Sequence, residues 1–171
     1  TYPIAFKVDV KNPTEFDFKG YEASMVKSKV TNGDRLFYDV SKPFTKSVKY
    51  YNNFKATKEV SIPKAYVLKS GWHKVITRLE NNQIAYTRFK NDTTFTAETQ
   101  YINDYKTRKN AYEGHYLHYN TTVSKIEREV SFKAGDIYIP TNQNGIRYII
   151  ETLEAEAVDS FFNWNFFDTI L

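Results

Sequence analysis

Apolar residues recur at intervals of three and four residues in two segments of the chain, which is the spacing of one helix face. The first set is Trp72, Val75, Ile76 and Leu79, and the second is Ile146, Ile149, Ile150 and Leu153. Ser70 stands before the first set and is predicted to cap that helix. Each predicted helix follows a short apolar strand, at 65–68 and 137–139. A weak two-copy repeat of strand, loop and helix and a chance similarity explain this arrangement equally well.

Alternating apolar and polar residues predict strands over much of the remaining chain. The clearest early strand runs from Ile4 to Val10, and Phe16 and Phe18 alternate again before Gly20. Asn32-Gly33 predicts a hairpin that joins strands at 26–30 and 35–40. Further strands are expected at 84–89, 93–105 and 116–132, and at 48–60 without a clear period. The order of strand, helix and strand over 65–89 permits a parallel crossover.

These elements predict an α+β fold of mostly antiparallel strands, with two short amphipathic helices on a mixed sheet. A β-sandwich with helical insertions is the alternative. The length suits a single domain, 1–171, with a possible subdivision into a β-hairpin lead-in, 1–60, and a strand-helix core, 61–171. The chain starts at Thr1 without Met and ends on Leu171, so we expect it to be a piece of a longer protein.

Composition narrows the function classes. The chain has no Cys, which excludes disulfides, thiolate metal sites and Cys nucleophiles. No stretch approaches the roughly 20 apolar residues that a membrane-spanning helix needs. The net charge is +4, with 13 basic and 7 acidic side chains in 1–70 but 1 basic and 6 acidic in 134–171. Because the Lys residues are scattered, we expect no nucleic-acid partner.

The best candidates for metal ligands lie in one Tyr-rich segment. Glu113, His115 and His118 are chemically suited to bind zinc, but on a strand the two His side chains point to opposite faces. Gly114 and the surrounding Tyr residues disfavour a helix that would bring them together. The favoured interpretation is one packed His and one exposed His, with no metal, cofactor or catalytic site. A Ser/His/Asp triad stays open, although no G-x-S-x-G, P-loop, G-x-G-x-x-G or H-E-x-x-H motif is present.

A dense aromatic segment near the end of the chain is the candidate interface. Its members are Phe161, Phe162, Trp164, Phe166 and Phe167. Such a cluster either stacks sugars or peptide side chains, or forms a core or an interface with a missing partner domain. We favour the partner domain, and expect either this segment or the Tyr-rich 48–60 stretch to be more exposed than a free-standing domain tolerates.

Several segments resemble one protein family. They are Phe18-Lys19-Gly20-Tyr21-Glu22, Pro63-Lys64-Ala65-Tyr66-Val67-Leu68, Gly71-Trp72-His73-Lys74-Val75-Ile76, Tyr112-Glu113-Gly114-His115-Tyr116, Gly135-Asp136-Ile137-Tyr138-Ile139-Pro140-Thr141-Asn142-Gln143, Arg147-Tyr148, Glu151-Thr152-Leu153-Glu154 and Asp159-Ser160-Phe161-Phe162-Asn163-Trp164-Asn165-Phe166-Phe167. Together they resemble the region C-terminal to the catalytic domain in large bacterial zinc carboxypeptidases of the carboxypeptidase A type. The long C-terminal run is the most specific part.

The resemblance implies an accessory region of an exported metallopeptidase that removes C-terminal residues from peptides. Enzymes of this family bind zinc through an H-x-x-E pair and a distant His, and use a Glu as general base. The residue three places after His73 is Ile76, after His115 it is His118, and after His118 it is Thr121, so no H-x-x-E pair is present. We therefore expect zinc in the parent enzyme but no catalytic residue in this chain. The expected partners are the catalytic domain and, through it, the peptide substrate.

Two other functions stay open at this stage. An independent module that binds a glycan or a peptide through aromatic platforms predicts affinity without any partner domain. A self-contained metalloenzyme at Glu113, His115 and His118 predicts stoichiometric metal in the purified chain.

Overall fold

The computed structural model describes residues 1–170. The chain divides into two compact units, an arm unit of Lys7–Lys55 and a core unit of residues 1–6 and 56–171. The sequence had suggested a cut at residue 60, with all of 1–60 on one side; residues 1–6 instead belong with the core unit. Each unit is described by itself below.

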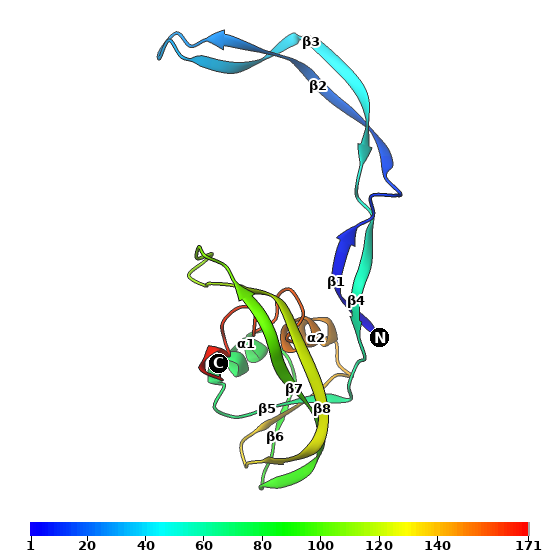
Figure 1. Cartoon of the computed structure of the whole chain (residues 1–171), viewed down its shortest axis with the longest axis vertical. Helices are drawn as coiled ribbons and strands as arrows, with labels where there is room; N and C mark the ends of the chain where they lie inside the picture. Colours follow the sequence, from blue (N-terminus) through cyan, green and yellow to red (C-terminus); the bar gives the residue numbers. More distant parts are fainter. Residues whose placement is uncertain (171) are drawn as a thin grey trace. The chain divides into compact units, whose positions relative to one another are not determined.

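Strands dominate the structure (Figure 1). In chain order the elements are β1 (Tyr2–Val8), β2 (Thr14–Lys27), β3 (Asp34–Tyr50), β4 (Phe54–Val60), β5 (Ala65–Leu68), α1 (His73–Asn81), β6 (Thr87–Arg88), β7 (Thr93–Thr107), β8 (His118–Phe132), β9 (Ile137–Pro140), α2 (Ile146–Leu153) and the 3-10 turn η1 (Asp168–Ile170). The strands form open sheets, with β1 paired to β4, β2 to β3 and β7 to β8. The predicted combination of mostly antiparallel strands and two short helices is confirmed.

Both helices lie where the apolar spacing places them. Val75, Ile76 and Leu79 of α1 are buried, as are Ile149 and Ile150 of α2. The predicted cap at Ser70 is wrong, because α1 begins after Trp72 and no side chain caps it. The backbone N–H of Ser70 instead donates to Asp136 Oδ1, at 2.8 Å. Ser70 is therefore engaged by the turn before β9 and does not cap α1.

The central sheet of the core unit has the order β5-β9-β6. Strand β9 runs antiparallel to both of its neighbours, with Tyr66 opposite Ile139 and Thr87 opposite Tyr138. Consequently β5 and β6 run in the same direction and α1 connects them, but β9 lies between them. The expected mixed sheet is therefore wrong for these strands, because the later strand enters between the two that the crossover would have paired.

The hydrophobic core forms between this sheet and the two helices. Its buried members are Leu68, Val75, Ile76, Leu79, Ile84, Ile137, Ile139, Ile149 and Phe161. A second cluster joins Ile4 and Val60 to Ile150 and Ala157. The first strand therefore packs against α2 and the segment that follows it. This second cluster is the physical reason why residues 1–6 belong to the core unit.

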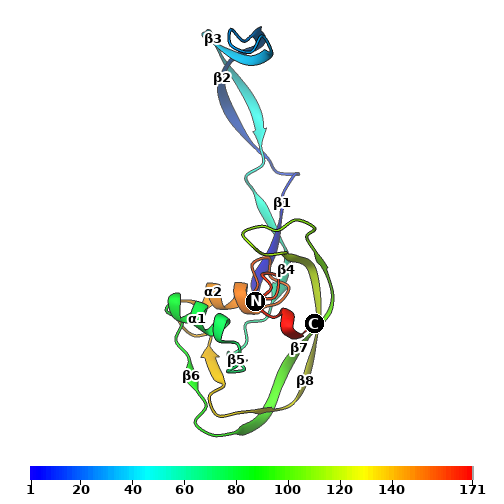
Figure 2. The same cartoon turned by 90° about the vertical axis from the view of Figure 1, so that its left-hand side faces the viewer.

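The β7–β8 hairpin is anchored to the core by polar groups around the buried Glu154. The carboxylate of Glu154, just after α2, accepts hydrogen bonds from Tyr66 Oη at 2.6 Å and Gln100 Nε2 at 3.0 Å. Lys125 Nζ lies 3.3 Å from the same carboxylate. Burial and the Glu154 carboxylate raise the pKa of Tyr66, so its hydroxyl stays protonated and donates. Figure 2 shows the segment that follows α2 between the helices and this hairpin.

Within residues 1–170, no helix is both long enough and apolar enough to span a lipid bilayer.

Candidate interaction surface

The arm unit is a two-stranded ribbon without a hydrophobic core (Figure 1). Asp9 is its only buried residue, with 8% of its surface exposed. The Asp9 carboxylate accepts hydrogen bonds from Asn12 Nδ2 at 2.7 Å and from Lys11 N, and it pairs with Lys55 Nζ at 2.8 Å. These contacts hold the pKa of Asp9 below its ordinary value, Asn12 contributing most. Asp9 therefore closes the base of the ribbon by polar contacts.

One face of the ribbon is aromatic near its base. The register places Phe16 opposite Val48, Phe18 opposite Lys46 and Gly20 opposite Phe44. The ring centroids of Phe16 and Tyr50 are 5.8 Å apart, and those of Phe18 and Phe44 are 6.1 Å apart. Phe16 and Tyr50 each remain about half exposed, at 52% and 53%. We call Phe16, Phe18, Phe44, Val48 and Tyr50 the aromatic face.

The opposite face of the same segment is polar. Its pairs are Glu15 with Lys49, Asp17 with Ser47, Lys19 with Thr45 and Tyr21 with Pro43. A sheet with one apolar face and one charged face is typical of a sheet that covers a protein core on one side and faces water on the other. Within the arm unit nothing covers the aromatic face, and an isolated two-stranded ribbon is only marginally stable in water.

Further along, the apolar pairs are Ala23 with Tyr38 and Met25 with Leu36. They lie beyond an irregularity between Tyr21 and Glu22, where the register shifts. Met25, Leu36 and Tyr38 are all more than half exposed. Because side chains alternate sides along a strand, Ala23 and Met25 lie on the side of Glu15, Asp17 and Lys19, so the aromatic face does not extend past the irregularity.

Two residues of the interface predicted at the end of the chain are buried within the core unit. Phe161 and Phe162 are 5% and 2% exposed, and Phe161 belongs to the hydrophobic core. The ring of Phe162 packs against Tyr105 at 5.4 Å and His118 at 5.1 Å. Two adjacent residues are buried because the chain turns here and passes between the central sheet and the β7–β8 hairpin.

The other three aromatic residues of that segment are partly buried. Phe167 meets the Trp72 ring edge-on at 4.8 Å, and Phe166 meets Phe161 at 5.1 Å. Trp164 Nε1 donates to Asp159 Oδ1 at 3.3 Å. Most of the Tyr-rich 48–60 stretch, by contrast, is exposed, including Tyr50, Tyr51 and Phe54, although Val60 at its end is buried. The expectation of excess exposure is thus confirmed for the 48–60 stretch only.

The three candidate metal ligands do not converge. Glu113 and Gly114 form a tight turn with positive φ angles of 49° and 80°, and Glu113 is exposed. The ring of His115 stacks on Phe166 at 6.1 Å and meets Trp164 at 5.4 Å. Among residues 1–170, no group of three His, Cys, Asp or Glu side chains is arranged to hold a metal ion.

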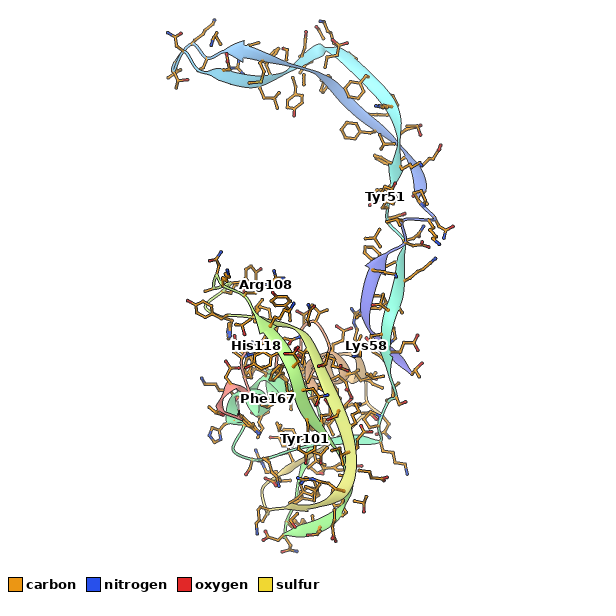
Figure 3. The ribbon with its side chains drawn as sticks, in the orientation of Figure 1. Tyr51, Lys58, Tyr101, Arg108, His118 and Phe167 are labelled. Carbon is orange, nitrogen blue, oxygen red and sulfur yellow. The ribbon has the colours of Figure 1, made fainter. Side chains whose placement is uncertain are left out.

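His118 is buried at the start of β8 and serves as a bridge (Figure 3). Its Nδ1 lies 2.9 Å from Thr107 Oγ1, and its Nε2 lies 3.1 Å from Asp168 Oδ1 and 3.2 Å from Asn165 Nδ2. Thr107, His118 and Asp168 thus place a hydroxyl, an imidazole and a carboxylate in a row, as in the catalytic triads of hydrolases. However, the imidazole lies between the rings of Tyr105 and Phe162, which leave 7% of the residue exposed. The cluster fastens the end of the chain to the hairpin.

A small cavity of about 200 Å³ lies in the core unit, lined by Ile4, Phe6, Arg147, Glu151, Ala157, Val158 and Asp159. Arg147 Nε donates to Glu151 Oε1 at 3.0 Å, which is the i,i+4 pair of α2. Sites for drug-sized ligands usually have 300–1,000 Å³. The cavity is therefore smaller than the usual site for a drug-sized ligand.

Comparison with protein-family models found no match, and neither did comparison with curated proteins or with solved structures. The aromatic face, which has no covering layer within the arm unit, is the strongest functional feature of the molecule. The sequence analysis identified Phe16 and Phe18 as alternating residues, but it did not predict that they share a face with Phe44, Val48 and Tyr50. The signal was partial, since Phe44, Val48 and Tyr50 stand at even positions between Thr45, Ser47 and Lys49, but Lys46 interrupts the apolar series.

Proposed function

We propose that this chain is a non-catalytic accessory domain of a zinc carboxypeptidase, and that the aromatic face of the arm unit packs on the catalytic domain. The observation that carries the proposal is a ribbon with an apolar face and no core of its own. A partner that covers this face gains about 1.5–3 kcal/mol for each fully buried Phe side chain. The family resemblance of the core unit supplies the identity of the partner.

In this proposal zinc and the catalytic Glu belong to the parent enzyme, which is exported to the periplasm or the cell surface. The core unit is of the α+β class, and it carries the arm unit on β1 and β4. The arm packs on the catalytic domain and shapes its substrate cleft. The polar face of Glu15, Asp17 and Lys19 stays in water.

The test is limited proteolysis of the N-terminally extended chain, in its natural reading frame, with one substitution on each face. Phe18→Glu puts a charge on the aromatic face, and Thr45→Glu puts the same charge on the polar face as a matched control. We expect cleavage within residues 7–55 to accelerate by about tenfold or more in Phe18→Glu, because proteolysis follows the population of the open form. Thr45→Glu should leave the cleavage rate close to that of the unsubstituted chain. Equal rates for the two variants would show that the aromatic face is not covered.

A second candidate is a glycan- or peptide-binding module at the loop between β7 and β8. Tyr112 and Tyr116 are exposed there, at 59% and 55%, and the ring of Tyr112 lies 6.3 Å from Trp164. This candidate requires the 171-residue chain to bind an oligosaccharide or peptide by itself. Titration calorimetry of the chain with an oligosaccharide or a peptide tests this candidate, with Tyr112→Ala as the control. Saturable binding that Tyr112→Ala weakens would support it, and no binding would exclude it.

A further inference from the structure

The two edges of the ribbon differ. In the described residues, β2 and β3 pair only with each other, so each has one free edge. The β3 edge is interrupted, because Pro43 has no N–H to donate and residues 40–42 have no partner in the register. Strand β2 contains no Pro and all of its residues follow the register without a gap. Natural proteins block exposed edges with Pro and with irregularities, and here only β3 is blocked in this way.

We propose that the free edge of β2 pairs antiparallel with β2 of a second copy of this chain, about a two-fold axis at Phe18. This inference goes beyond the proposed function, since it concerns the edge of the ribbon and not its face. In the resulting register Phe18 lies opposite Phe18 of the second copy, and Asp17 lies opposite Lys19. Two ribbons then form one sheet in the order β3-β2-β2-β3.

Charge complementarity sets this register. Glu15, Asp17 and Lys19 share the polar face, and none of them has an oppositely charged partner within 4 Å in the described residues. The two-fold register forms the Asp17–Lys19 pair twice and places Glu15 opposite the Tyr21 hydroxyl twice. If the axis moves to Asp17, the two Asp17 side chains lie opposite each other. If it moves to Lys19, the two Lys19 side chains lie opposite each other. Like charges directly opposite each other destabilise a sheet.

The same register preserves the aromatic face. Side chains directly opposite each other in an antiparallel pair lie on one side of the sheet, so Phe16 and Phe18 of both copies share a side. The four-stranded sheet has a mostly apolar face, interrupted by Lys46 opposite Phe18, and it exceeds the three strands that a stable sheet needs, which a lone ribbon does not. The face remains free for the catalytic domain, so both interactions are compatible.

A charge swap tests the pairing. Sedimentation velocity measures the dissociation constant of the dimer for the full 171-residue chain, for Asp17→Lys, for Lys19→Asp and for the double variant. We expect a dimer for the unsubstituted chain, a dissociation constant raised about tenfold or more in each single variant, and recovery to within about twofold in the double variant. Both positions are exposed on the ribbon, so circular dichroism should show unchanged folding.

Cross-linking gives an independent measurement, because the chain has no Cys of its own. Residues directly opposite each other have Cα atoms about 4.5–5.5 Å apart, within reach of a disulfide. Phe18→Cys should therefore form a disulfide-linked dimer on oxidation, and Phe16→Cys should not. A monomeric unsubstituted chain at about 100 µM, single variants that dimerise normally, or a double variant that fails to recover would each overturn the proposal.

Discussion

Asp136 is the residue on which the turn before β9 depends. It is 2% exposed, and its carboxylate accepts hydrogen bonds from the backbone N–H groups of Ser70 and Lys133, at 2.8 and 2.9 Å, while Lys69 Nζ lies 3.2 Å away. Burial by itself would raise the pKa of Asp136, but these donors outweigh it and hold the pKa below its ordinary value. The charged form is therefore the one that stabilises the fold.

We expect Asp136→Asn to lower the free energy of unfolding by about 2 kcal/mol at pH 7, because the amide N–H₂ group would face backbone donors. Since the folded pKa lies below the unfolded value of about 3.9, the stabilising effect is present above that pH and is lost as the pH falls through the folded pKa. The difference between the unsubstituted chain and the variant should thus shrink below about pH 4. Urea unfolding from pH 7 to pH 3 measures this. Glu129→Gln, an exposed change on β8, is the control, and a difference that stays constant with pH would contradict the account.

At the scale of single elements, the start of α2 has no room for a side chain. A Cβ atom built at Gly145 would clash with Cδ1 of Ile84, which is buried at 4% exposure. We expect Gly145→Ala to destabilise the chain by about 1–3 kcal/mol, because the extra methyl group overpacks the core. Ile84→Val removes Cδ1 and costs about 1 kcal/mol alone.

In the double variant Gly145→Ala/Ile84→Val the clash is gone, so the total loss should be smaller than the sum of the two single losses. Thermal unfolding of the four proteins measures this coupling. Strictly additive losses, or a more stable Gly145→Ala protein, would show that Ile84 does not limit the space at Gly145.

The elements also show which parts of the fold the sequence predicts. Both helices follow from their own residues, because an apolar stripe such as Val75, Ile76 and Leu79 needs only local spacing. The order β5-β9-β6 does not follow, because it depends on β9 entering between two strands that lie more than 40 residues earlier in the chain. The burial of Phe162 was missed for a similar reason. Its neighbours Tyr105 and His118 belong to a distant hairpin, and an aromatic run has the same composition in a core and in an interface.

At the scale of the whole molecule, the two units differ in what holds them together. The core unit has a continuous apolar interior between a three-stranded sheet and two helices. The arm unit has Asp9 as its single buried residue and exposes its aromatic face. The aromatic face could be predicted in part, from the alternation around Phe16 and Phe18. The Asn32-Gly33 turn predicted the pairing at the tip of the hairpin, but not its extension as far as Thr14 and Tyr50. This contrast motivates our proposal that the chain functions as an attached, non-catalytic domain and that its arm needs a partner.

The measurement that tests this claim most directly is peptidase activity on peptides with free and blocked C-termini, together with zinc analysis of the same samples. It compares the 171-residue chain with the chain extended N-terminally in its natural reading frame. The account predicts zinc and release of C-terminal residues from free peptides in the extended chain, and neither in the 171-residue chain. Zinc or activity in the 171-residue chain, or neither in the extended chain, would contradict it.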